Sequence, residues 1–127
     1  MDRREHLKNA IADLQADFDS AERDANRTKG RIEKVQDAIV RLSARESGLQ
    51  LDMDAATHPD TLHLERLPED IAVELSGVLG GLTELERLLR QYLRDNELHR
   101  QTLRSRQGEL ERRRDDLAQL DAAEAKR

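Results

Sequence analysis

Apolar residues recur along this chain at alternating spacings of four and three residues, which places them on one face of a supercoiled helix. The first run consists of Leu7, Ile11, Leu14, Phe18, Ala21, Ala25, Thr28, Ile32, Val35, Ile39, Leu42, Glu46, Leu49 and Met53. Only Thr28 and Glu46 in this run are polar. A period of about 3.5 residues held over so many turns is typical of coiled coils. The pattern therefore predicts a long first helix.

A second run with the same spacing begins at Ile71 and predicts a second long helix. It continues through Leu75, Val78, Leu82, Leu85, Leu89, Tyr92, Asn96, His99, Leu103, Arg106, Leu110, Arg113, Leu117 and Leu120. Polar or charged residues occupy four of these positions, namely Asn96, His99, Arg106 and Arg113. This helix is expected to have a less continuous apolar face than the first.

Both prolines of the chain lie between the two runs, in the stretch "AATHPDTLHLERLPED". Pro59 disfavours helical geometry at the residue before it. Pro68 suits the first turn of a helix, and Glu69 and Asp70 place negative charge at the positive end of the helix dipole. The sequence predicts a single domain with a first helix over residues 1–56, a connector over 57–67 and a second helix over 68–125.

Charge favours an antiparallel hairpin over a parallel dimer. In a hairpin, residues whose numbers add to about 124 face each other, so that Leu42 meets Leu82 and Thr28 gives the Asn96 amide a possible partner. A basic strip on the second helix contains Arg100, Arg104, Arg106, Arg112, Arg113 and Arg114. The hairpin sets this strip against an acidic segment of the first helix, with Asp13, Asp17, Asp19, Glu22 and Asp24, whereas a parallel dimer sets the strip against itself. The alternation of isoleucine and leucine in the first helix, together with Asn96, favours the parallel or intertwined dimer that remains as the alternative.

The second helix is wider on its apolar side near the connector than a two-helix seam requires. Leu79, Leu88 and Leu93 flank the seam close to Tyr92, and Val40 and Leu51 add apolar surface on the first helix. A stripe of this width favours the packing of a further helix, so we expect these leucines and Tyr92 to bind a partner. We expect two hairpins to form a homodimeric four-helix bundle near the connector; isolated exposed leucines are the alternative.

Three glycines, Gly77, Gly80 and Gly81, fall within the same segment of the second helix. Each weakens a helix interior by about 1 kcal/mol relative to alanine. Two interpretations remain: a partner helix approaches or the helix kinks here, or the helix is frayed and begins only after Gly81.

Composition supports a thin seam and excludes several classes of function. Of 127 residues, 39% are charged and 2% are aromatic, and the net charge is −5. High charge with few aromatic residues also characterises disordered chains, but the regular apolar spacing argues against disorder. The negative charge disfavours nucleic acid and anionic membranes as partners. The chain has no cysteine and no apolar run of about 18 residues, so we expect a cytoplasmic protein without membrane attachment.

No group of residues in the sequence has the spacing of a catalytic or metal-binding motif. His58 and His63, with Asp54 and Asp60 nearby, are separated by five residues across a proline, unlike the four-residue spacing of helical zinc motifs. His99 lies on the seam, where a polar layer is favoured over a pH sensor. Two packed helices also offer no enclosed pocket. We therefore expect no catalytic residues, no metal and no cofactor.

These patterns together predict an all-α protein that is not an enzyme. Its expected function is that of a coiled-coil interaction or scaffold module, whose partner is a second copy or another helical protein. The alternative is a nucleic-acid-associated helical module that uses the basic strip, since clustered arginines are typical of phosphate binding.

Overall fold

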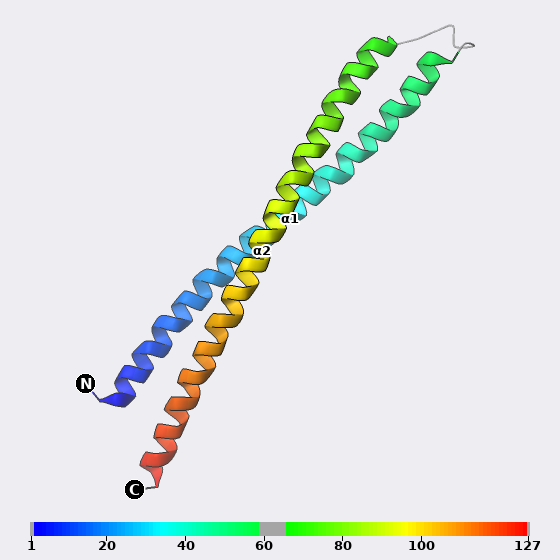
Figure 1. Ribbon diagram of the computed structural model, residues 1–127. Coiled ribbons are helices and arrows are strands. Elements are labelled where there is room, and N and C mark those ends of the chain that lie inside the picture. Colours follow the sequence, from blue (N-terminus) through cyan, green and yellow to red (C-terminus); the bar gives the residue numbers. More distant parts are fainter. Residues whose placement is uncertain (1, 59–65, 127) are drawn as a thin grey trace. The chain divides into compact units, whose positions relative to one another are not determined.

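Two long α-helices make up the fold. The computed structural model describes residues 2–58 and 66–126, within which α1 spans Arg3–Thr57 and α2 spans Pro68–Ala125 (Figure 1). The described residues contain no strand. The all-α hairpin predicted from the heptad pattern is thereby confirmed.

Local hydrogen bonds explain where each helix begins and where α1 ends. A carboxylate oxygen of Asp2 accepts the backbone N–H of Glu5 at 2.8 Å, which is the geometry of an N-cap. At the start of α2, the carbonyl of Leu67 accepts the N–H groups of Asp70 and Ile71 at 3.1 and 3.2 Å, and Pro68 occupies the first turn. At the end of α1, the Thr57 hydroxyl donates to the carbonyl of residue 53 at 2.9 Å.

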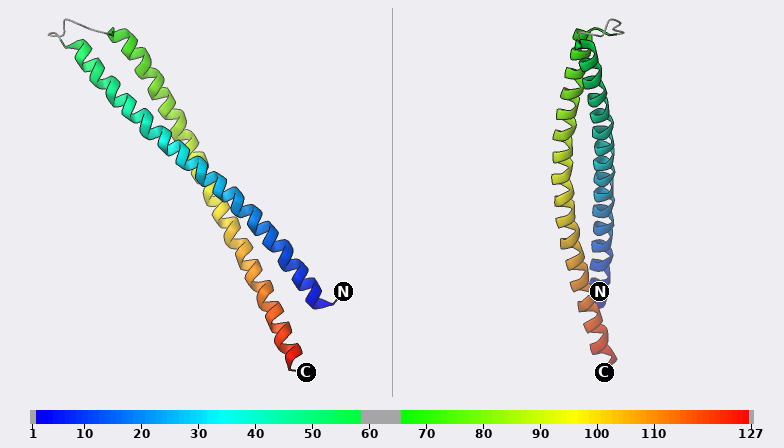
Figure 2. Two further views of the ribbon diagram at one scale, coloured as in Figure 1. Left: turned by 180° about the vertical axis from the view of Figure 1, so that it is seen from behind. Right: turned by 90° about the vertical axis from the view of Figure 1, so that its right-hand side faces the viewer.

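The chain divides into two compact units, each built from one segment of α1 and one of α2. The connector unit comprises Gly30–Leu93, and the terminal unit comprises Met1–Lys29 and Arg94–Arg127. In each unit the two helical segments run antiparallel and side by side (Figures 1 and 2).

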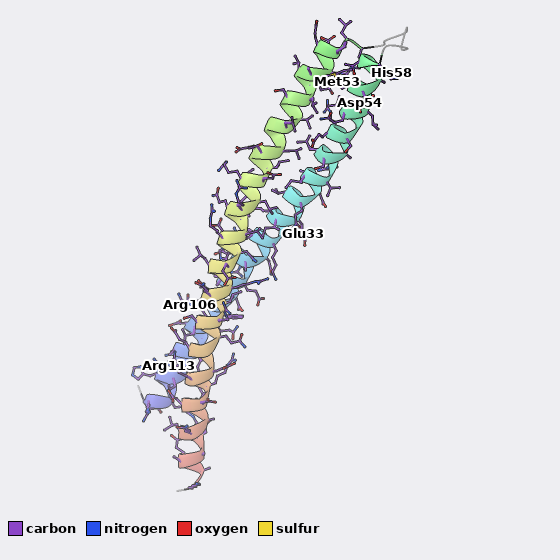
Figure 3. All side chains as sticks on the ribbon, turned by 45° about the vertical axis from the view of Figure 1, so that its right-hand side comes forward. Glu33, Met53, Asp54, His58, Arg106 and Arg113 are labelled. Atoms are coloured by element: carbon purple, nitrogen blue, oxygen red, sulfur yellow. The ribbon has the colours of Figure 1, made fainter. Side chains whose placement is uncertain are left out.

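The connector unit has its core at the heptad seam. Leu49, Ile71, Val78 and Leu82 are buried together, and Ile39, Leu42, Met53, Ala56 and Leu75 pack against them. Figure 3 shows Met53 between the helices and Glu33 pointing away from α2. Ile71 is the most deeply buried large side chain, with 1% of its surface exposed.

The terminal unit is held by a thinner seam and by polar contacts between α1 and α2. Leu7, Ala25 and Leu110 are buried. The Arg4 guanidinium forms an ion pair with Asp121 and a second one with Glu124 at 3.4 Å. These carboxylates raise the pKa of Arg4, the Asp121 hydrogen bond being the main cause.

The expected register is present in both units. Arg4 pairs with Asp121, Arg114 donates to Gln15 and Arg45 pairs with Glu74, and the sum of residue numbers in each pair lies within about five of 124. Every residue of the two predicted seam runs is buried or half-buried except Arg113. Its long side chain extends from the seam into solvent, as arginine commonly does.

The three glycines lie within continuous helix. Since α2 begins at Pro68 and no described residue has a positive φ, the interpretation that the helix starts after Gly81 is wrong. A Cβ atom added at Gly81 would lie 3.0 Å from Cδ2 of Leu42, whereas Gly77 and Gly80 have open space. The close approach of a helix at Gly81 is therefore that of α1.

The expected hydrogen bond between Thr28 and Asn96 is absent. The buried Thr28 hydroxyl donates to the Asp24 carbonyl of its own helix at 3.2 Å, and the buried Oδ1 of Asn96 has no hydrogen-bond partner. A threonine hydroxyl reaches the carbonyl four residues earlier without any adjustment of the partner helix, which explains this outcome.

Candidate interaction surfaces

The predicted partner-binding leucines lie on two different edges of α2. With Val78 and Leu85 at heptad position d, Leu79 and Leu93 fall at position e, whereas Leu88 falls at position g on the opposite side of the seam. Leu79 and Leu93 are exposed, whereas Leu88 and the seam residue Tyr92 are half-buried. Leu79 and Leu93 therefore share one edge of α2, and Leu88 lies on the other edge.

Contacts within the connector unit show which edges of α1 and α2 face each other. Arg45 and Glu74, both at position g, form an ion pair, and Leu42 lies against Gly81, which is also at position g. The g edges of the two helices therefore meet on one side of the seam. The e edges, including Leu79, meet on the other side.

A surface without ionisable residues covers the middle of the e side of the connector unit. We call it the uncharged face; it consists of Gln36, Val40, Ser43, Ser47 and Gln50 of α1 and Ala72, Ser76, Leu79 and Thr83 of α2. All of these residues are exposed except Ser43, which is half-buried, and Val40 is 69% exposed. In a chain with 39% charged residues, such a continuous absence of charge favours contact with another protein surface.

Sequence reasoning did not identify most of this face, although the signal is present. Residues 36–50 of α1 and 72–83 of α2 repeat uncharged side chains at spacings of four and three, offset from the main seam. A search for large apolar residues passes over this repeat because serine, threonine and alanine dominate it.

The opposite edge of the connector unit carries a cluster of ion pairs at Glu74. Glu74 accepts hydrogen bonds from the guanidinium groups of Arg45 in α1 and Arg66 before α2. These bonds, first that of Arg45 and then that of Arg66, hold the pKa of the Glu74 carboxyl below its ordinary value. The arginines thereby link both helices to the end of the connector.

The basic strip lies on the terminal unit, and most of its arginines are exposed. Arg106 is half-buried, whereas Arg100, Arg104, Arg112, Arg113 and Arg114 are exposed; Figure 3 shows Arg106 and Arg113 on α2. Arg104 contacts Glu97 at 3.5 Å and Arg113 contacts Asp116 at 3.9 Å, both within α2.

The expected ion pairs between the strip and the acidic segment of α1 are absent. Within residues 2–58 and 66–126, no strip arginine pairs with Asp13, Asp17, Asp19, Glu22 or Asp24. Arg114 instead donates to the Gln15 amide oxygen at 2.7 Å. The two segments share a unit, but their charges attract each other only through solvent, which makes the contribution small.

An open groove of about 800 Å³ runs beside part of the strip. Asp13 of α1 and Glu109, Asp115 and Asp116 of α2 line it together with Arg112 and Arg113. Carboxylates therefore surround the guanidinium groups at this point. Such a lining weakens the attraction of the strip for phosphate.

The described residues place few other chemical groups together. Figure 3 shows Asp54 and His58 near the connector end of α1, while Asp60 and His63 lie outside the described residues. His99 is half-buried on the seam. Among the described residues there is no cluster of three potential metal ligands, and neither helix has an apolar stretch that could cross a membrane.

Comparison with known proteins identifies no relative for this fold. No protein-family model, no curated protein sequence and no solved structure matches the chain.

Proposed function

We propose that this protein is a non-enzymatic coiled-coil interaction module, which assembles with itself or docks into a larger complex. The observation that carries this proposal is the uncharged face, where Val40 and Leu79 stay exposed next to an already complete seam. A charged surface keeps coiled coils apart, whereas a face of this composition allows a second surface to pack without burying charge. A cytoplasmic location is part of the proposal.

The helical architecture also supports a binding function over catalysis. The groove beside Asp13 and Arg112 is open to solvent, and its walls are the exposed sides of two helices. General acid–base catalysis depends on groups held in a pocket that excludes water. We therefore assign binding, and not a reaction, to this chain.

Affinity capture from the source cells tests the proposal when it compares two matched variants. Leu79→Glu places a charge on the uncharged face, and Leu98→Glu places the same charge on an exposed leucine of the terminal unit. Proteins that bind through the face are retained by wild type and Leu98→Glu and lost with Leu79→Glu. If both variants retain the same proteins and the same self-association as wild type, the face is not the binding surface.

A nucleic-acid-associated module remains the second candidate, favoured by the exposed arginines that do not pair with α1. DNA or RNA binding through the strip weakens steeply as salt rises. Replacing Arg104, Arg112 and Arg113 with alanine should then abolish binding, whereas replacing Arg23, Arg27 and Arg31 of α1 should leave most of it. Absence of binding at about 20 mM salt, where phosphate contacts are strongest, excludes this candidate.

A further inference from the structure

Charged residues bound the uncharged face of α2 at both ends, and their arrangement indicates what covers it. The alternating spacing of four and three residues that defines the face continues to Glu69 before Ala72, and to Glu86 and Arg90 after Thr83. All three side chains are exposed, and among the described residues none of them forms an ion pair. The face thus presents an uncharged centre with an acidic end and an end that terminates in an arginine.

We infer that a second copy of this chain covers the face, with the two α2 helices antiparallel about a two-fold axis that passes Leu79. This inference rests on the proposed function and identifies its partner. Under this symmetry Leu79 meets its own counterpart, and Ser76 of one copy lies opposite Thr83 of the other. Along the helix axis, Glu69 of each copy lies about 1.5 Å from Arg90 of the other and about 4.5 Å from Glu86, so the opposite charge is the nearer one at both ends of the interface.

The side chains near the axis suit such an interface. The Thr83 hydroxyl already donates to the Leu79 carbonyl at 3.0 Å, so its burial leaves no hydroxyl proton without an acceptor. Gly80 lies beside Leu79 with open space where a Cβ atom would be. Gly80, at heptad position f on the border of the face, therefore places no side chain next to Leu79. On α1, the same axis passes close to the small residues Ser43 and Ser47.

Charge distinguishes this arrangement from the other two-fold packing of the same faces. When both connectors point the same way, α1 of one copy covers α2 of the other. That packing pairs Glu33 with Arg90, but it also brings Asp54 opposite Glu69. Like charges at such a contact act against it, whereas the antiparallel packing places Glu69 nearer to Arg90 than to Glu86.

The size of the face sets the expected strength of association. It contains nine residues per copy, fewer than the roughly 20–30 residues per partner of a standard stable interface. We therefore expect a dissociation constant in the micromolar range, on the order of 10–100 μM.

Sedimentation equilibrium of the full chain from about 5 to about 500 μM tests the inference, with circular dichroism as the control for folding. Glu69→Arg and Arg90→Glu should each weaken dimerisation about tenfold, because each sets like charges together at both ends of the interface. The combined variant, with both substitutions in one chain, should recover wild-type affinity. Asp37→Arg and Arg41→Glu on the exposed outer side of α1 should have no effect.

Cysteine cross-linking checks the geometry, since the natural chain contains no cysteine. Ser76→Cys and Thr83→Cys chains mixed together should form a disulfide-linked dimer faster than either chain alone. Two Ser76 positions lie about 9 Å apart along the helix axis in this arrangement, beyond the reach of a disulfide.

Three results overturn the inference. They are a monomer at the highest concentration, no recovery in the charge-swapped variant, and cross-linking of Ser76→Cys alone that equals the mixture. If the chain is monomeric while Leu79→Glu still abolishes capture of another protein, the second copy is wrong but the proposed function stands. If neither self-association nor face-dependent capture occurs, both fail.

Discussion

The glycines of α2 provide a quantitative test of the packing of the connector unit. Gly77 and Gly80 lie in continuous helix with open space at the Cβ position, whereas a Cβ atom at Gly81 meets Leu42 at 3.0 Å. Alanine at each of the three positions therefore introduces the same change in helix propensity but a different change in packing.

The expected magnitudes follow from these contacts. Gly77→Ala and Gly80→Ala should each raise the free energy of unfolding by about 1 kcal/mol, through better helix propensity and a less flexible unfolded chain. The double variant should gain about 2 kcal/mol if the two sites act independently. At Gly81 a similar gain is offset by a displaced Leu42 rotamer, which costs about 0.5–1.5 kcal/mol, so Gly81→Ala should lie close to wild type.

Urea and thermal unfolding followed by circular dichroism measure these differences. A chain concentration of about 5 μM lies below the dissociation constant expected for the dimer, so the monomer is measured. A gain of 1 kcal/mol corresponds to a rise in Tm of about 3–5 °C for a chain of this length. Equal m-values among the variants show that the change is one of stability and not of unfolded-state compactness.

Two results contradict this reasoning. No gain at Gly77 or Gly80 means that these positions are not in helix, or that another part of the chain covers them. A full gain at Gly81 means that Leu42 does not lie against it.

Three further predictions test the seam and the ion pairs. Ile71→Ala should lower the free energy of unfolding by about 2–5 kcal/mol, whereas Val73→Ala, at a residue 75% exposed, should change it by less than about 0.5 kcal/mol in urea unfolding. Asn96→Leu should raise stability by about 1 kcal/mol, because the variant no longer buries an amide oxygen without a partner; lower stability of this variant contradicts the assignment. The lowered pKa of Glu74 means that its contribution is present above the ordinary glutamate pKa and lost as pH falls through the folded value. Wild type should therefore be more stable than Glu74→Gln at pH 7 and lose this difference below about pH 4, and a constant difference across this range argues against the ion pairs.

The sequence predicts the seam well because burial at every third or fourth residue depends on backbone periodicity alone. Ile71 and Leu110 are buried for this reason, and the antiparallel register also follows from matching seam positions and charge. To predict the side of the seam on which a flanking residue lies, its heptad position is needed as well. Counting these positions separates Leu79 from Leu88 without any structure.

Polar side chains were harder to place because each has several partners within reach. Arg104 and Arg113 contact carboxylates of their own helix instead of the acidic segment of α1, since these carboxylates lie within reach whatever the distance between the helices. Thr28 likewise bonds to its own helix, which leaves Asn96 unpaired. The periodicity of the sequence carries no information on these choices.

The ion pairs that join the helices imply an order of folding. Arg45 and Glu74 are 29 residues apart in the chain, whereas Arg4 and Asp121 are 117 apart. Closing the longer loop from the unfolded chain costs about 1.2 kcal/mol more in entropy. The apolar cluster around Ile71 also joins segments of α1 and α2 that are close together along the chain. The hairpin should therefore nucleate beside its connector, and pairing should spread from there towards the two chain ends.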